Sequence, residues 1–302
     1  MDRTRRRTPL ASVAALMLAV VAGVALAVAI DVVRTGGPAS WLARHHLSPP
    51  YDARGERFDI GPRTLYLDCR GEGQPTVVLE AGSGADSATW GAVLDSLAEI
   101  TRTCAYDRAG RGRSDPIERH TLSHASAELR ALLSTAGEAP PFVVMGHSLG
   151  GAFGRVFASV NRDEVVGLAL VDSFDPDLQE GWIHPLLGSL RPEYEAGLDA
   201  LRDTVAYVDS LDWPRSEEQL RESSLEGLPI EVLVAPRYEP RLSQAVNAEI
   251  AMAWEAAYER LSPGRVRWTI AWGAGHNVHI DRPDVVIEAV RRVVDEARST
   301  GG

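Results

Sequence analysis

Residues 142–151 read Phe-Val-Val-Met-Gly-His-Ser-Leu-Gly-Gly. Residues 142–145 are typical of a buried strand, and those after Ser148 are typical of a helix. Between them, residues 146–150 match the pattern Gly-x-Ser-x-Gly. A turn from strand to helix holds such a serine in a strained conformation, and flanking glycines let the chain pass without clashes. The stretch therefore predicts that Ser148 is an exposed nucleophile.

On either side of this turn, short apolar runs alternate with helical patterns, which is typical of a mostly parallel sheet flanked by helices. Residues 63–68 alternate like a half-exposed strand. Further strands are predicted at 76–79, 103–106, 142–145, 168–171, 230–234 and 266–272, and helices at 88–99, 121–136, 149–160, 241–261 and 283–298.

One interval departs from this alternation of strands and helices. More than fifty residues separate the strand that ends at Asp172 from the one that begins near Ile230, too many for a simple crossover. Their apolar residues, including Trp182 and Trp213, recur at loosely helical spacing. The pattern predicts a helical cap at about 173–228 that covers the active site. An extra helical pair packed on the main core would give the same pattern.

Four motifs occur in a fixed order along the chain: 76–84, 104–115, the serine turn at 146–150, and Gly275-His276 followed by 281–283. With them the chain resembles the α/β-hydrolase superfamily, specifically its capped, esterase-like bacterial members, over roughly residues 56–298. The resemblance implies the α/β-hydrolase fold, with the cap inserted between two late strands, and a serine–histidine–acid triad.

The predicted general base is His276, because it follows the last predicted strand on a loop that carries glycine. His147 and His279 are expected to be structural. The backbone N–H of Leu149, the residue after the nucleophile, is the first expected donor of an oxyanion hole. The resemblance implies the Ser83 N–H as the second. Ala81 stands where the family usually has histidine, but a backbone donor does not depend on that side chain.

The acid of the triad is less clearly marked. Relatives usually carry it after the strand that here is 230–234, where the chain offers only Glu239. A minority of the superfamily takes it from the end of the preceding strand, which here is Asp172. Asp172 is the favoured acid and Glu239 the alternative, with Asp175 and Asp177 as further candidates. Each would orient the imidazole and stabilise the imidazolium.

The two cysteines are predicted to form a disulfide. In the sheet that the resemblance implies, strand 63–68 runs antiparallel beside strand 103–106. Cys69 ends the first and Cys104 begins the second, so the two thiols are expected at the same end of neighbouring strands. A bridge suits an exported protein, and two free buried thiols are the alternative.

The N-terminus carries a targeting signal. Four arginines among the first seven residues precede the uncharged apolar run 10–30, which as a helix would span about 30 Å, the thickness of a bilayer core. Residues 1–34 are therefore predicted to anchor the chain in the cell membrane, with the catalytic domain outside. A cleaved signal peptide, giving a secreted protein, is the alternative. Residues 35–55 are predicted to be a linker and 56–302 the hydrolase domain.

Composition and motifs narrow the function. A formal net charge of −11 argues against binding of nucleic acid, which requires a basic surface. No cofactor is expected, and no metal-binding motif is present in the sequence. Serine at the turn, where epoxide hydrolases and haloalkane dehalogenases of the superfamily have Asp, argues against those activities. The expected function is hydrolysis of small-molecule carboxylic esters through an acyl-enzyme.

Two other functions stay open. An aminopeptidase acting on an amide substrate would need a cap carboxylate for the substrate's amine, and Glu193, Glu195 and Glu217 are the candidates. A non-catalytic ligand-binding protein of the same fold is the other alternative, because one fold serves many functions.

Overall fold

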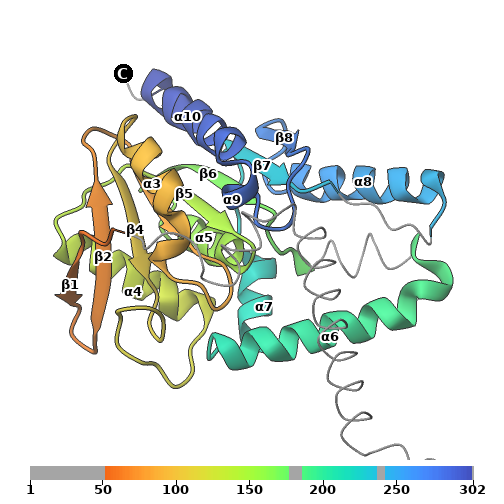
Figure 1. Cartoon of the computed structure of the whole chain (residues 1–302), viewed down its shortest axis with the longest axis horizontal. Helices are drawn as coiled ribbons and strands as arrows, with labels where there is room; N and C mark the ends of the chain where they lie inside the picture. Colours follow the sequence, from red (N-terminus) through yellow and green to blue (C-terminus); the bar gives the residue numbers. More distant parts are fainter. Residues whose placement is uncertain (1–51, 177–185, 237–241, 301–302) are drawn as a thin grey trace, which may run out of the picture. The chain divides into compact units, whose positions relative to one another are not determined.

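The computed structural model describes residues 52–176, 186–236 and 242–300. These residues belong to one compact unit, Pro49–Gly302. Within them, eight strands form one sheet in the order β1-β2-β4-β3-β5-β6-β7-β8, drawn in Figure 1. The strands are β1 (Glu56–Asp59), β2 (Thr64–Arg70), β3 (Thr76–Glu80), β4 (Thr103–Asp107), β5 (Phe142–His147), β6 (Val165–Val171), β7 (Ile230–Val234) and β8 (Val266–Ile270).

The sheet is mostly parallel, as predicted. β2 pairs antiparallel with β1 and with β4, whereas the neighbours from β4 through β8 pair in parallel. The helices that flank and connect the strands are η1 (Ser87–Trp90), α3 (Gly91–Ala98), α4 (Leu122–Thr135), α5 (Leu149–Val160), η4 (Gly188–Leu190), α6 (Arg191–Val208), α7 (Trp213–Glu222), α8 (Gln244–Glu259), α9 (Val278–Asp281) and α10 (Pro283–Thr300).

Helices cover both faces of the sheet, which explains why its central strands are apolar without alternation. Side chains of β5 alternate between two clusters: Val143 and Met145 pack with α3 and α10, whereas Phe142 and Val144 pack with α4, α5 and α8. The predicted α/β architecture is therefore confirmed. One layer of the hydrophobic core lies on each face of the sheet. The parallel strands all end at the same edge of the sheet.

Two longer helices, α6 and α7, lie in the predicted insertion between β6 and β7. Leu220 of α7 packs with Leu122 of α4 and Phe153 of α5, so α7 extends the main core. Residues of α6 line the cavity beside Ser148. The two interpretations of this interval thus apply to different helices: α7 packs on the core, and α6 forms a wall of the site. Trp182 lies outside the described residues.

Strand β1 differs from the sequence prediction, which begins the series of strands at residue 63. Its residues Glu56–Asp59 are mostly exposed and carry a single apolar side chain, Phe58. An edge strand that lacks a buried face has no apolar alternation, so periodicity does not detect it. Its register with β2 makes it one arm of a hairpin.

The predicted anchor (1–34) and nearly all of the predicted linker (35–55) lie outside the described residues. In the part of the chain that the structure describes, no helix is both long and apolar enough to cross a membrane.

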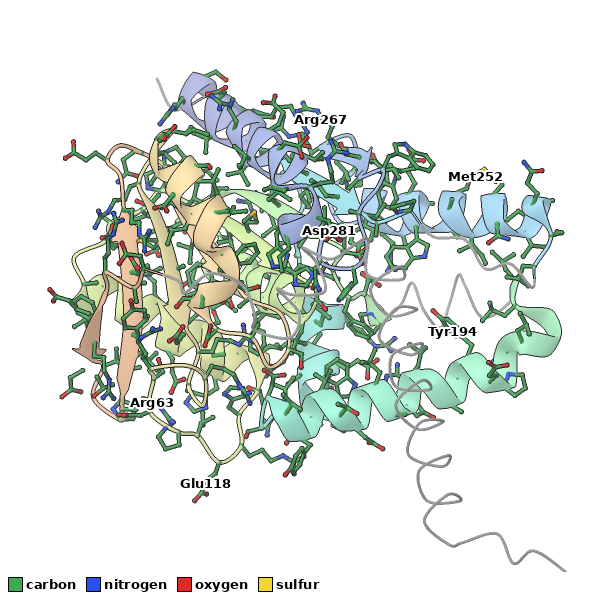
Figure 2. The ribbon with its side chains drawn as sticks, viewed as in Figure 1. Arg63, Glu118, Tyr194, Met252, Arg267 and Asp281 are labelled. Atoms are coloured by element: carbon green, nitrogen blue, oxygen red, sulfur yellow. A yellow bond between two sulfur atoms is a disulfide. The ribbon has the colours of Figure 1, made fainter. Side chains whose placement is uncertain are left out.

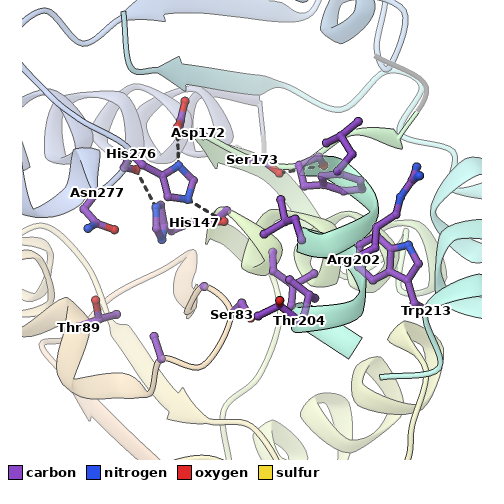
Figure 3. A pocket seen from close by; sticks show the side chains of 18 of the residues that line it. Ser83, Thr89, His147, Asp172, Ser173, Arg202, Thr204, Trp213, His276 and Asn277 are labelled. Atoms are coloured by element: carbon purple, nitrogen blue, oxygen red, sulfur yellow. Dashed lines mark hydrogen bonds and ion pairs between the residues drawn. The ribbon is translucent and has the colours of Figure 1, made fainter. Parts of the chain in front are cut away.

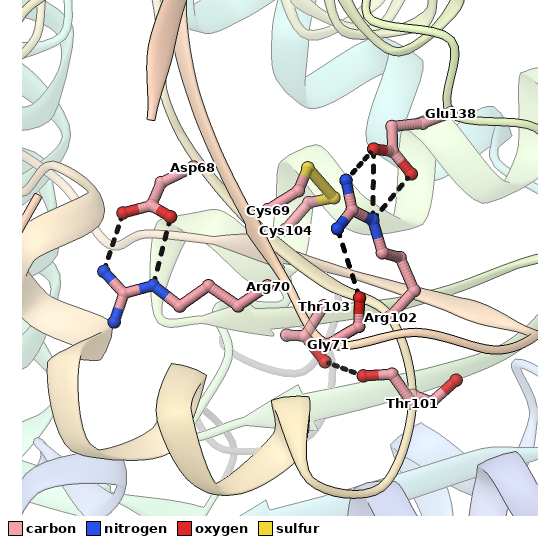
Figure 4. Close-up of a disulfide and its surroundings, with 9 residues drawn as sticks. All are labelled: Asp68, Cys69, Arg70, Gly71, Thr101, Arg102, Thr103, Cys104 and Glu138. Carbon is pink, nitrogen blue, oxygen red and sulfur yellow. Dashed lines mark hydrogen bonds and ion pairs between the residues drawn. A yellow bond between two sulfur atoms is a disulfide. The ribbon is translucent and has the colours of Figure 1, made fainter. Parts of the chain in front are cut away.

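The two cysteines are joined in a disulfide (Figure 4). Cys69 of β2 lies directly opposite Cys104 of β4 in the antiparallel ladder, with the two Cα atoms 4.0 Å apart. An ion pair between Arg102 and Glu138 lies beside the bridge, at 2.6 Å. The bridge therefore links the antiparallel edge of the sheet to its parallel part.

Candidate active site

Ser148 occupies the turn between β5 and α5 in a strained conformation, with φ 53° and ψ −121°. Few residues other than glycine adopt a positive φ, and such outliers cluster at functional sites. The flanking glycines are required by close packing. A Cβ on Gly146 would lie 2.4 Å from the Gly150 carbonyl oxygen, and a Cβ on Gly150 would lie 2.2 Å from the Glu80 carbonyl oxygen. The sequence Gly-x-Ser-x-Gly thus lets the chain turn tightly enough to present the serine hydroxyl.

His276 connects Ser148 to Asp172 (Figure 3). Its Nε2 atom lies 2.9 Å from the Ser148 Oγ, and its Nδ1 atom lies 2.6 Å from Oδ2 of Asp172. With the Nδ1–H donating to the carboxylate, Nε2 is free to accept the serine proton. This tautomer is the one that base catalysis by His276 requires.

Asp172 is held rigidly at the end of β6. Its Oδ1 atom accepts a hydrogen bond of 3.1 Å from the Ala235 backbone N–H, so the carboxylate has partners at both oxygens. Its own backbone has φ 44°, a second strained position in the site, and the side chain is buried. A carboxylate fixed in this way orients the imidazole of His276.

The other candidate acids are placed differently or are not described. Asp175 forms a buried ion pair of 2.7 Å with Arg155 and a second of 3.3 Å with Arg260, so it serves to pair these arginines. Glu239 and Asp177 lie outside the described residues.

Two further histidines lie behind His276. The Nε2–H of His147 donates to the His276 backbone carbonyl at 2.9 Å, and the rings of His147 and His279 pack with centroids 4.3 Å apart. Burial is the main cause that lowers the pKa of His147 to about 3, and it lowers that of His279 well below its usual value. Both rings are therefore neutral near pH 7, and His147 supports the loop that carries His276.

The two predicted oxyanion donors border the same cavity as Ser148. Leu149 is the first residue of α5, so no helical carbonyl can accept its N–H. Ser83 lies on the loop that follows β3. Donors from a helix N-terminus and a neighbouring loop are well suited to stabilise negative charge that develops at a carbonyl oxygen.

The cavity beside Ser148 has a volume of about 560 Å³. In Figure 3, Thr89 and Asn277 lie on one side of the His147–His276 pair, and Arg202 and Trp213 lie on the other, toward α6 and α7. The lining on this second side is largely apolar and includes Phe174, Tyr194, Leu198, Leu201, Val205 and Trp213. Tyr194 extends from α6 on the side that faces α8, whereas Met252 of α8 points outward (Figure 2).

None of the three glutamates suggested for an aminopeptidase belongs to the described lining of this cavity. Glu195 pairs with Arg191 at 2.6 Å. Glu217 pairs with Arg202 at 3.1 Å and so neutralises the cation that borders the cavity.

One cluster in the described residues has the spacing of a metal site: Cys69, Cys104 and Glu138. Its two sulfur atoms are bonded to each other, and its carboxylate pairs with Arg102. These atoms are therefore engaged in other bonds.

Comparison with known proteins decides the family. A model of the "Alpha/beta hydrolase family" matches residues 77–289, which is well over half of the chain and contains Ser148, Asp172 and His276. The chain belongs to the α/β-hydrolase family.

Individual relatives within this family are distant. The uncharacterized protein YqjL of Bacillus subtilis is 25% identical over 229 residues, which cover 73% of this chain and 84% of YqjL. Several other curated relatives, 30–40% identical, are matched over less than half of their own length.

Solved structures share the fold at lower identity. A serine hydrolase involved in carbazole degradation (CarC enzyme) has a TM-score of 0.57 at 21% identity, covering 80% of this chain and 98% of that one. A thermophilic esterase from Thermogutta terrifontis has a TM-score of 0.53 at 20% identity, covering 81% and 99%. At these identities the likeness shows the fold.

The α/β-hydrolase site also contains a buried residue that the sequence does not reveal. Asp209, at the end of α6, accepts hydrogen bonds from the loop that carries Ser83. An isolated aspartate at a helix end has no motif around it, and its partners are more than a hundred positions away in the sequence. Arg108, its ionic partner, falls within a recognised motif, but its role there depends on the fold.

Proposed function

We propose that this protein is a serine hydrolase that cleaves carboxylic esters through an acyl-enzyme. The observation that carries the proposal is the continuous line from Ser148 Oγ to His276 Nε2, at 2.9 Å, and from His276 Nδ1 to the Asp172 carboxylate, at 2.6 Å. These three residues line a largely apolar cavity. Nucleophile, base and orienting acid are the three groups that acyl transfer by serine requires.

In the first step the Ser148 oxygen attacks the ester carbonyl while its proton passes to His276 Nε2. The carbonyl oxygen becomes an oxyanion, which the Leu149 and Ser83 N–H groups stabilise. The C–O bond to the alcohol then breaks, and His276 returns its proton to the departing oxygen. In the second step, water gives a proton to His276 and attacks the acyl group. The carboxylic acid leaves, and Ser148 regains its proton from His276.

The lining of the cavity favours esters over peptides with a free amino terminus. Asp172 is the single carboxylate in the described lining, and it is engaged by His276 and the Ala235 amide. Among the described lining residues, an ammonium group would therefore find no carboxylate that is not already engaged, and desolvation without a counter-ion is costly. The apolar side toward α6 suits a hydrophobic acyl or alcohol group, and a volume of about 560 Å³ fits a small molecule.

The same proposal places the enzyme at or beyond the cell membrane, either anchored through residues 1–34 or secreted after their removal. The apolar run 10–30 and its basic flank support export. The Cys69–Cys104 disulfide also supports it, because such bonds persist in oxidising compartments. Protease digestion of intact cells is expected to degrade the catalytic domain of an anchored protein without lysis.

The decisive test is hydrolysis of p-nitrophenyl esters of increasing acyl length by the full-length protein in mild detergent. Ser148→Ala is expected to remove turnover and to retain the circular dichroism spectrum. Ser96→Ala is the matched control, because Ser96 lies on α3 outside the described lining of the cavity and its hydroxyl donates to the Ala92 carbonyl. A fluorophosphonate that labels wild type but not Ser148→Ala, without any ester turnover, would favour another acyl substrate. A folded protein that shows neither reaction would overturn the proposal and favour a ligand-binding role.

A further inference from the structure

The end of helix α6 is attached to the loop that follows β3. Asp209, the C-cap residue that directly follows α6, is buried. One of its carboxylate oxygens accepts a hydrogen bond from the Ser83 hydroxyl, and the other accepts one of 3.3 Å from the Gly84 backbone N–H. A residue of the inserted segment between β6 and β7 thus contacts the loop that contributes Ser83 to the cavity.

Arg108, which contacts Asp209, holds the same loop at its carbonyl groups. Its guanidinium donates to the Ala81 carbonyl at 2.6 Å and to the Gly82 carbonyl at 2.9 Å. Arg108 is buried and does not belong to the described lining of the cavity, whereas Gly82 and Ser83 do.

The hydrogen bond from Arg108 to the Gly82 carbonyl fixes the direction of the Ser83 N–H. The carbonyl of Gly82 and the N–H of Ser83 belong to one trans peptide plane, in which they point in opposite directions. Because the Gly82 carbonyl is bound by Arg108, the Ser83 N–H points away from the Arg108 guanidinium. Rotation of this plane would turn the donor away from the oxyanion and would break the Arg108 contact.

Arg108 and its two carboxylate partners are buried. Arg108 lies between the Glu80 carboxylate, at 3.2 Å, and the Asp209 carboxylate, at 3.3 Å. Arg111 approaches Asp209 at 3.7 Å. A carboxylate at a helix C-terminus lies at the unfavourable end of the helix dipole, so Asp209 does not stabilise α6 by its position. Its hydrogen bonds to the loop and its pairing with Arg108 are the favourable interactions that hold it there.

The turn after Asp209 is itself anchored. Ser210 adopts φ 52°, and its carbonyl accepts a hydrogen bond of 2.9 Å from the His120 N–H. The Asp212 N–H donates to the His120 carbonyl at 2.7 Å. The end of α6 is therefore bonded both to His120 and to the loop at 82–84.

We infer that Asp209 is a positioning residue for the oxyanion hole: through the Ser83 hydroxyl and the Gly84 N–H it holds the loop in the orientation in which the Ser83 backbone N–H meets the oxyanion. The inserted segment then contributes to the rate of the chemical step as well as to the shape of the cavity. This inference rests on the proposed function, because an oxyanion forms only if Ser148 attacks an acyl or phosphoryl centre.

The test compares Asp209→Ala, Ser83→Ala and wild type in two reactions. For p-nitrophenyl ester hydrolysis, kcat is expected to fall about 10- to 100-fold in Asp209→Ala with KM changed less than about twofold, because a misplaced donor weakens only the transition state. Ser83→Ala keeps the backbone N–H and loses one of the two links, so a smaller fall in kcat is expected. Asp209→Asn keeps an acceptor oxygen and is expected to recover part of the rate.

The second reaction is labelling by a fluorophosphonate, in which the Ser148 oxygen bonds to phosphorus and fluoride leaves. Its rate constant is expected to fall in parallel with kcat, whatever the natural ester is. Asp203→Ala, at an exposed position on the same helix, is the matched control and is expected to match wild type in both reactions.

The outcomes separate the two proposals. A change in KM alone, or a loss of rate that disappears when corrected for the fraction unfolded in each variant, would overturn the positioning role of Asp209 and leave the proposed function intact. Unchanged labelling in Asp209→Ala would do the same. A wild-type protein that neither hydrolyses esters nor becomes labelled would overturn the proposed function and this inference with it.

Discussion

Asp172 Oδ2 lies 2.6 Å from Nδ1 of His276, so the carboxylate that follows β6 contacts the histidine that follows β8. β6 is the immediate neighbour of β5, and the register pairs His147, the residue before the serine, with Val171, the residue before Asp172. The turns that carry nucleophile and acid therefore follow adjacent strands at the same edge of the sheet. His276 reaches both from the loop after β8. Asp172 therefore remains the proposed acid.

Asp172→Asn is expected to lower kcat for ester hydrolysis by about 10³- to 10⁴-fold with little change in KM, because an amide cannot stabilise the imidazolium and favours the wrong tautomer of His276. Steady-state kinetics on one p-nitrophenyl ester checks this. Thermal unfolding of the same samples separates the loss of catalysis from a loss of folding.

The matched comparison is Glu239→Gln, which tests the other acid that the sequence suggests. Its kcat is expected to stay within about threefold of wild type, since one orienting carboxylate suffices for a triad. If Glu239→Gln falls as far as predicted for Asp172→Asn, and Asp172→Asn remains active, the acid is assigned wrongly.

Val205→Trp is expected to shorten the range of accepted esters. Val205 lines the apolar side of the cavity from α6, and the larger ring fills space that a long chain would occupy. We expect kcat/KM for octanoate or longer esters to fall about 10- to 100-fold and that for acetate to change less than about threefold. Tyr207→Ala, which removes a side chain that is 87% exposed on the same helix, controls for changes to α6 itself. An equal fall in kcat/KM for esters of all chain lengths would contradict the assignment of the acyl chain to the apolar side of the cavity.

Removal of the disulfide is expected to lower stability without lowering kcat. Cys69 and Cys104 are 35 positions apart, and closing a loop of that size stabilises the folded state by about 3–4 kcal/mol in the chain-entropy model. Urea unfolding of the double variant Cys69→Ala/Cys104→Ala measures the loss. Dithiothreitol should bring wild type to the stability of the variant and leave the variant unchanged. Identical urea midpoints for the oxidised wild type and the variant would show that the bridge is absent in solution.

Much of the fold was predictable because its signals are local. The run 142–151 gives strand, turn and helix, and α5 has the bounds that were expected, Leu149–Val160. Apolar runs located the parallel strands because helices cover both faces of the sheet. The exposed edge strand β1 lacks such a run and was missed.

The site was predictable where a motif carries it. Ser148 and His276 have glycine-bearing turns around them, and the sequence narrowed the acid to a few carboxylates. Asp209 was missed because its role depends on where the end of α6 lies, and its contacts to Ser83 and Arg108 join positions more than a hundred residues apart. Such long-range polar contacts leave no periodic trace in a single sequence.

His120→Phe is expected to make the protein less sensitive to acid. Burial, and next the positive charge of Arg108, lower the pKa of His120 to about 4, and neither ring nitrogen has a hydrogen-bond partner among the described residues. Between pH 6.5 and 4 the unfolded chain binds a proton at His120 that the folded chain does not. The free energy of unfolding therefore falls by up to about 1.4 kcal/mol for each unit by which the pH is lowered. His147 and His279 act in the same direction, while burial raises the pKa of Glu80 and opposes them. Urea unfolding at pH 7, 6 and 5 should give a plot of unfolding free energy against pH that is less steep in His120→Phe, with a difference that approaches one bound proton between pH 6 and 5. Phe153→Leu, which alters a ring packed against His120, should shift this plot without changing its slope. Parallel curves for wild type and His120→Phe would mean that this imidazole does not titrate between the two states.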